Sequence, residues 1–217
     1  MIFSRTNLLC LTSLVVPALC CLSCSFTTRG NLTDHISGII VVEGFSDSVA
    51  SWQLSGNRYW AANRDGNSIA VVNTALGSGV SPIWYQEPPP ANFEVRVQAT
   101  LEKEGLDGGW GVEFGAQKRK HAYRALVYGS GRFCVDRVFD LYPEFIHCIP
   151  FQPEVNAGET RNTMAVRVVG QKISVSVNGE EVVVFTDDRY SPGELALAVA
   201  GAGTGVSFED MVLISLD

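Results

Sequence analysis

The run KISVSVNGEEVVVF, residues 172–185, decides the fold of this chain. Two stretches rich in β-branched residues flank Asn178-Gly179, a dipeptide that accepts the positive φ angles of a two-residue turn. Ile173, Val175 and Val177 alternate with polar residues, which is the period of a strand with one buried face. The run therefore predicts a β-hairpin.

A two-residue loop at this turn pairs Val175 with Val182 and Ile173 with Val184, so the apolar face continues on the return strand. Val183 then points to the opposite face, which is therefore not plainly polar.

The rest of the chain repeats this strand pattern. Apolar and polar residues alternate in several further runs, among them residues 93–101, 110–114, 123–128 and 132–138. Gly, Asn and Pro residues separate these runs, and no segment of ten or more residues shows a clean helical period. Roughly a dozen strands without a helix predict an all-β protein built from two packed antiparallel sheets, as in a jelly-roll sandwich.

The composition narrows the classes of protein and of ligand. The 217 residues carry a formal net charge of −7, and this acidic excess argues against nucleic-acid binding, which needs clustered cations. The only basic run is Lys118-Arg119-Lys120, followed by His121. It is read either as a contact for an anionic ligand or as a solvated loop between strands. Residues 39–217 are predicted to form one β domain.

The N-terminus has the features of an export signal. An apolar run, residues 8–22, follows Arg5 and is too short for a comfortable membrane span, so residues 1–24 are predicted to be a signal peptide. Its end, residues 21–24, resembles a bacterial lipobox in which Cys24 would be lipidated; cleavage without lipid is the alternative. Residues 25–38 are polar and are predicted to form a tether. The protein is expected to be secreted or held at the bacterial cell envelope, touching the membrane only through this anchor.

Two cysteines remain outside the signal segment. Residues 132–138 and 145–149 are predicted to be neighbouring antiparallel strands, and in that register Cys134 faces Cys148. Because disulfides persist in exported proteins, a cross-strand disulfide is expected, with two free buried thiols as the alternative.

Several stretches taken in order resemble one known family. The chain is similar to the concanavalin A-like and laminin-G-like jelly-roll domains, in particular to a bacterial exported branch with 3-keto-disaccharide hydrolase-type domains. The stretches that carry the resemblance are GFSD at 44–47, FEVRV at 93–97, HAYRALV at 121–127, RVVGQKISVSVNG at 167–179, PGELALAV at 192–199 and VSFED at 206–210. These motifs are structural, so the resemblance implies the fold rather than an activity.

The residues give little sign of catalysis or of a cofactor. Glycoside hydrolases of the sandwich family use carboxylates in a Glu-x-Asp-x-x-Glu pattern, which is absent here. Glu209-Asp210 and Asp187-Asp188 are interpreted as structural or turn-stabilising pairs. His35, His121 and His147 are far apart and lack metal-ligand spacing. No cofactor and no metal site are predicted, and a calcium site is left open.

A binding face is the remaining candidate. Alternation places four side chains on the outward face of the hairpin formed by residues 123–138, and three aromatic side chains could add stacking rings; these are Arg124, Tyr128, Arg132 and Asp136, with Trp60, Trp110 and Tyr142. The alternative is that the tryptophans fill the core and the charged groups solvate the sheet.

The sequence thus predicts an exported, non-catalytic module that binds a glycan or contacts an envelope protein. A glycosidase-like enzyme of the 3-keto-disaccharide hydrolase type and an envelope adhesion domain are the alternatives.

Overall fold

The structure is a computed structural model that describes residues 38–43, 45, 52–54, 56–77, 79–118, 120–140 and 142–217. The predicted signal peptide with Cys24, and the tether up to residue 37, lie outside the described residues. Within the described residues no helix is long and apolar enough to cross a membrane.

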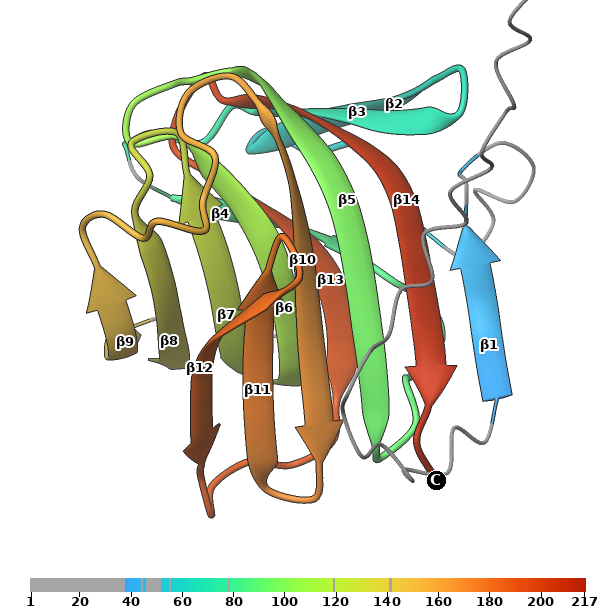
Figure 1. The fold of residues 1–217 in the computed structure, drawn as a ribbon. Helices are drawn as coiled ribbons and strands as arrows, with labels where there is room; N and C mark the ends of the chain where they lie inside the picture. The colour runs from blue at the N-terminus through green and yellow to red at the C-terminus, as the bar shows by residue number, and fades with distance from the viewer. Residues whose placement is uncertain are drawn as a thin grey trace, which may run out of the picture. The chain divides into compact units, whose positions relative to one another are not determined.

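The described strands form two antiparallel sheets, which confirms the predicted fold class (Figure 1). The larger sheet has eight strands in the order β12-β11-β10-β5-β14-β3-β2, with β1 paired to β14. Its strands are β1 (Gly38–Glu43), β2 (Trp60–Asp65), β3 (Ser68–Asn73), β5 (Phe93–Lys103), β10 (Arg161–Val169), β11 (Lys172–Val177), β12 (Glu180–Thr186) and β14 (Gly205–Ser215).

The smaller sheet has six strands in the order β4-β13-β6-β7-β8-β9. Its strands are β4 (Val80–Trp84), β6 (Gly109–Gln117), β7 (His121–Tyr128), β8 (Phe133–Phe139), β9 (Tyr142–Ile149) and β13 (Glu194–Ala200). We call the face of this sheet that is turned away from the larger sheet the outer face.

The core lies between the two sheets and is built by the alternation visible in the sequence. Val95 and Val97 of β5 are fully buried, and so are Val112 and Phe114 of β6. The Trp110 ring meets Phe208 of the larger sheet edge to face, with 5.9 Å between ring centroids. One apolar face from each sheet therefore makes a single apolar cluster.

The Asn178-Gly179 hairpin forms as predicted. Asn178 has a φ of 51° and Gly179 a φ of 92°, the positive values that such a turn requires. Asn178 also fixes the turn with its side chain, because its Oδ1 accepts a hydrogen bond from the Thr163 amide at 2.9 Å and its Nδ2 donates to the Glu154 carbonyl at 2.7 Å.

The pairing beyond this turn differs from the prediction by one residue. Val175 lies opposite Val183, and Ile173 lies opposite Phe185. A β-bulge near Val175 adds one residue to the return strand, so Val182 loses its expected place. The bulge turns Val183 and Phe185 toward the core, where both are partly buried.

The two cysteines of the domain lie opposite each other on β8 and β9. Cys134 and Cys148 are cross-strand partners in the predicted register. Their Cα atoms are 4.1 Å apart and a disulfide joins their sulfur atoms. The bond ties the edge strand β9 to its neighbour.

Candidate functional site on the outer face

One residue from each strand of the smaller sheet contributes to a row that crosses the outer face. Each member lies directly opposite the next in the strand register, so the row runs perpendicular to the strands. We call it the polar row; it consists of Trp84, Ala196, Glu113, Arg124, Asp136 and Phe145, in that order from β4 to β9.

Strand alternation places the charged members of this row outside the core. On β7, Tyr123 and Ala125 point into the core, so Arg124 between them points outward. A β-bulge between β8 and β9 aligns Asp136 with Phe145 and leaves Ile146 packed against the core.

A cavity of about 660 Å³ lies over the polar row. Every member of the row except Ala196 lines it, and the lining also includes Tyr128, Arg132 and Cys148. This volume lies within the range of roughly 300–1,000 Å³ that is usual for small-molecule sites. We call it the outer cavity.

The rows on either side of the polar row are apolar. On one side lie Ala122, Val138 and Pro143, and on the other lie Pro82, Ala198, Gly111, Leu126 and the Cys134–Cys148 disulfide. Three ionisable side chains therefore stand in apolar surroundings, and this environment disfavours their charged forms unless they are paired.

Arg124 and Asp136 form such a pair. The Arg124 Nε donates to Asp136 Oδ1 at 2.8 Å, and Nη2 donates to Oδ2 at 3.1 Å. Both side chains are largely buried. Burial raises the pKa of Asp136, although its bonds to Arg124 oppose that shift. The pair holds the Arg124 guanidinium in a fixed plane beneath the cavity.

Glu113 lies beside this pair without a partner of its own. Its residue is 8% exposed, and none of the described residues forms a hydrogen bond or an ion pair with its carboxyl group. Burial raises its pKa to about 7 despite the attraction of Arg124, and the nearby Asp136 and Glu194 add to the rise. Near neutral pH the group is therefore present both as a hydrogen-bond donor and as an acceptor.

Tyr128 and Arg132 stand farther along the same face. The Arg132 guanidinium lies over the Tyr128 ring, 3.8 Å from its centroid. Arg132 Nη2 donates to both carboxylate oxygens of Asp107, at 2.7 and 2.6 Å. The four side chains predicted from alternation thus lie on one face and line one cavity. Their contact with a ligand stays a prediction.

The two tryptophans proposed as ligand rings are instead core residues. Trp110 is 1% exposed and Trp60 is 5% exposed, and both belong to the central cluster. The same alternation that buries Val112 and Phe114 also buries Trp110, so the prediction for this residue was wrong. Tyr142 is exposed on β9 but does not line the outer cavity.

Sequence reasoning missed three of the five members of the polar row that line the outer cavity. Glu113 alternates with Val112 and Phe114, so its outward position was readable from the strand pattern. Trp84 and Phe145 were not, because their places depend on the pairing of β4 with β13 and on the bulge of β9.

The described residues show no candidate metal centre. No group of three or more His, Cys, Asp or Glu side chains among them is arranged to hold a metal ion. His121 and His147 lie on different strands, and His35 lies outside the described residues.

Comparison with known proteins concerns the fold. No protein-family model matches the chain, and no curated protein matches it significantly. Among solved structures, the carbohydrate-binding module CBM66 from Bacillus subtilis aligns with a TM-score of 0.62 at 16% identity, over 76% of this chain and 96% of that one. A Bacillus subtilis protein of unknown function with a galectin-like fold aligns with a TM-score of 0.64 at 12% identity, over 82% and 96% of the two chains. The chain has the concanavalin A-like jelly-roll fold.

A further structural neighbour of this jelly roll is a larger enzyme. The xylan β-1,4-xylosidase from Bacillus halodurans C-125 aligns with a TM-score of 0.60 at 10% identity. The alignment covers 80% of this chain but 39% of the xylosidase. At such identities the likeness is one of fold, and the jelly roll leaves its outer face free to carry different sites.

Proposed function

We propose that the outer cavity binds carbohydrate and that the protein is a non-catalytic binding module. The observation that carries this proposal is the polar row, in which Glu113, Arg124 and Asp136 lie side by side between the aromatic rings of Trp84 and Phe145. Sugars offer both hydroxyl groups and flat apolar ring faces, so fixed polar groups beside aromatic rings suit them. The similarity in fold to the carbohydrate-binding module CBM66 gives the proposal further support.

The chemistry of the row suits a ligand that both donates and accepts hydrogen bonds. The remaining N–H groups of Arg124 donate, while Glu113 either donates or accepts according to its protonation. The exposed Phe145 ring offers an apolar surface at the end of the row. Binding a hydroxylated ring at this place would give the buried Glu113 carboxyl the hydrogen-bond partner that the protein does not supply.

A glycoside hydrolase, such as an enzyme of the 3-keto-disaccharide hydrolase type, is the second candidate. It is favoured by the pKa of about 7 for Glu113, which suits a general acid. Glu113 and Asp136 are two strands apart, and their backbones are therefore about 9.5 Å apart. Against it, both Asp136 oxygens accept hydrogen bonds from Arg124, which leaves Asp136 poorly placed to act as base or nucleophile.

We further propose that the module is exported, with cleavage near Cys24 and lipid attachment to that residue. The signal-like sequence of residues 1–24 supports export, and the Cys134–Cys148 disulfide agrees with an oxidising compartment. Intact mass measurement of the protein from its host membrane tests this. A mature N-terminus at Cys24 with a diacylglyceryl mass supports lipidation, and an unmodified N-terminus elsewhere would rule it out.

A glycan array tests the binding proposal, with Phe145→Ala and Glu113→Gln beside the unmodified protein. We expect selective binding, and Phe145→Ala should weaken it about three- to tenfold, the usual effect of one aromatic contact. Phe151→Ala is the matched control, because Phe151 is equally exposed but does not line the outer cavity.

The same array separates the alternatives. If the protein binds a glycan and also cleaves it, and if Glu113→Gln abolishes the cleavage, the protein is an enzyme and not a binding module. Absence of binding to every glycan would reject carbohydrate as the ligand and leave an envelope protein as the partner class to examine.

A further inference from the structure

A second cavity, of about 510 Å³, lies at the end of the smaller sheet where β7 begins and β8 ends. Its floor includes two cross-strand pairs that share the inner face of β7 and β8; these are His121 with Phe139 and Tyr123 with Arg137. We call it the side cleft. Arg124 and Asp136, which line the outer cavity, point to the opposite face of the same two strands.

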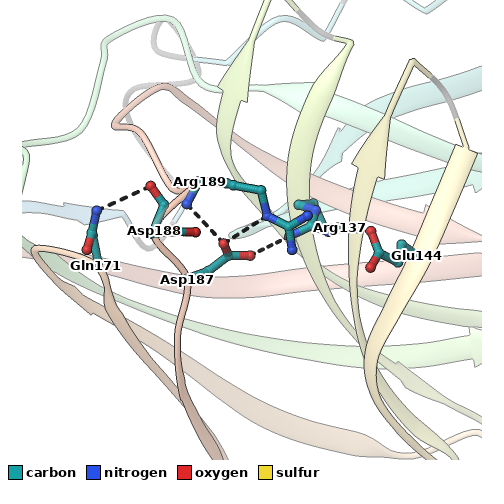
Figure 2. A network of polar contacts seen from close by, with 6 residues as sticks. All are labelled: Arg137, Glu144, Gln171, Asp187, Asp188 and Arg189. Atoms are coloured by element: carbon teal, nitrogen blue, oxygen red, sulfur yellow. Dashed lines mark hydrogen bonds and ion pairs between the residues drawn. The ribbon is translucent and has the colours of Figure 1, made fainter.

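A network of charged groups centred on Asp187 borders the side cleft (Figure 2), and its members Arg137, Glu144 and Arg189 line the cleft. Asp187 Oδ2 accepts from Arg137 Nη1 at 2.5 Å, and Oδ1 accepts from the backbone N–H and the Nε of Arg189, at 3.0 and 3.2 Å. Arg137 also pairs with Glu144 of β9. Both oxygens of the buried Asp187 are therefore occupied, and the carboxylate holds two guanidinium groups close together.

Arg189 has hydrogen-bond donors that are available to a ligand. Its side chain is 63% exposed, and its two terminal nitrogens bond to none of the described residues. The bond from Nε to Asp187 fixes the plane of the guanidinium, so its free edge is preorganised. A guanidinium edge matches the two oxygens of a carboxylate, and this geometry gives one of the stronger hydrogen-bonded pairs in proteins.

The lining of the side cleft also includes an exposed ring and groups that can bind hydroxyls. Phe139 is 58% exposed, and His121 stacks on it with ring centroids 4.2 Å apart and planes 14° from parallel. The exposed Glu144 carboxylate and the Ser191 side chain line the same space and can bond hydroxyl groups.

We propose that the side cleft is a second binding site, for a sugar unit that carries a carboxylate, as uronic acids do. The ligand carboxylate pairs with the free edge of Arg189, the sugar ring lies against Phe139, and hydroxyl groups bond to Glu144 and Ser191. Glu144 would repel an anion without hydroxyl groups, whereas a hydroxylated acid satisfies both Glu144 and Arg189. The proposal does not depend on the outer cavity being a sugar site.

The probes for this site are D-galacturonate, D-glucuronate and neutral D-galactose, each titrated into the purified ¹⁵N-labelled protein. We expect the two uronates to shift the amide signals of residues 121, 139 and 189, and galactose to bind at least about tenfold more weakly. The variant Arg189→Gln should lower galacturonate affinity at least about tenfold, which corresponds to about 1.4 kcal/mol. Because Arg189 is well exposed, this variant is expected to fold.

Two control variants test whether the loss of affinity is specific to the side cleft. Arg96→Gln removes a similarly exposed arginine from β5 of the larger sheet and should leave galacturonate affinity unchanged. Glu113→Gln alters the outer cavity alone and should also leave it unchanged.

Three results would overturn the proposal. They are equal affinity for galactose and galacturonate, unchanged affinity in Arg189→Gln, or shifts confined to residues of the outer cavity. The last result would reject the side cleft while strengthening the outer face as the carbohydrate site, so failure here and failure of the proposed function are distinguishable.

Discussion

Arg137 Nη1 lies 2.5 Å from Asp187 Oδ2, and this contact joins β8 of the smaller sheet to the segment that follows β12 of the larger one. Both side chains are buried. The two sheets also meet through the apolar cluster and through buried Asn73 of β3, whose Nδ2 donates to the Val199 carbonyl of β13 at 2.9 Å. The Arg137–Asp187 ion pair adds a charged, directional link to these contacts. It also orients Arg189, which shares the same carboxylate.

The pair predicts a specific loss of stability in acid. Burial alone would raise the pKa of Asp187, but hydrogen bonds from Arg189 and Arg137 lower it to about 2, against an ordinary value of 3.8. Because the pKa is lower in the folded protein than in the unfolded chain, the carboxylate stabilises the fold at pH values above the unfolded pKa. This contribution is lost as the pH falls from about 4 through 2. It amounts to at most about 2 kcal/mol.

Urea unfolding from pH 5 down to pH 2 measures this effect, with Asp187→Asn compared with the unmodified protein. The variant should be less stable at pH 5 and should lose less stability on acidification. Asp188→Asn changes the neighbouring exposed residue and should follow the unmodified protein. Parallel pH curves for Asp187→Asn and the unmodified protein would contradict the assignment.

The outer cavity predicts the opposite dependence on pH. The pKa of Glu113 is raised from 4.5 to about 7, chiefly by burial. Because the folded protein binds this proton more tightly than the unfolded chain does, the fold is relatively stable below pH 4.5 and loses stability as the pH rises through about 7. Glu113→Gln removes this loss, so it should stabilise the protein at pH 8, by about 3 kcal/mol at most, and have little effect at pH 4.5.

Melting temperatures of the two proteins at pH 4.5, 6 and 8 test this sign. Glu94→Gln offers a comparison, since Glu94 is also a poorly exposed glutamate but has ion-pair partners in Arg96 and Arg167. A Glu113→Gln variant that is destabilised at pH 8 would show that the carboxylate has a partner in the folded protein.

The Arg124–Asp136 pair predicts strong coupling between two substitutions. Removing one partner strands a charge in apolar surroundings, so Arg124→Met or Asp136→Leu alone should each cost about 3–5 kcal/mol. The double variant should be markedly more stable than the sum of the single costs implies. Chemical denaturation of the unmodified protein, the two single variants and the double variant measures this coupling. If the two single losses in unfolding free energy simply add up in the double variant, the pair is already well solvated.

The disulfide predicts a loss of folding stability when both of its cysteines are replaced, because the bond restricts the unfolded chain. Cys134 and Cys148 are separated by 14 residues, so replacing both with Ala should cost about 3 kcal/mol. Unfolding the unmodified protein with and without reductant should reproduce that difference. If reductant lowers stability equally in the double variant, the effect does not come from this bond.

The sequence predicted most of the fold because strand alternation is a local signal. Asn178-Gly179 identified the hairpin, and the pattern of residues 123–138 placed Arg124 and Asp136 on one face. The register of the return strand was wrong by one residue because a β-bulge depends on tertiary packing, here that of Val183 and Phe185 against the core.

The candidate site was harder to predict because its members come from six strands. Trp110 was chosen for its ring, although its alternation with Val112 already marks it as a core residue. Trp84 and Phe145 enter the polar row only through strand pairing, which the sequence does not specify by itself.

The polar row has a consequence for how this protein can diverge. Its members are spread along the sequence from Trp84 on β4 to Ala196 on β13. Trp84, Ala196, Glu113 and Arg124 each reach the outer face because both of their sequence neighbours belong to the core. Inserting or deleting one residue within any of these strands would exchange the two faces beyond that point, sending a site residue inward and a core residue outward. Changes in length should therefore collect in the connecting turns, while new ligand preferences arise by substitution at fixed strand positions.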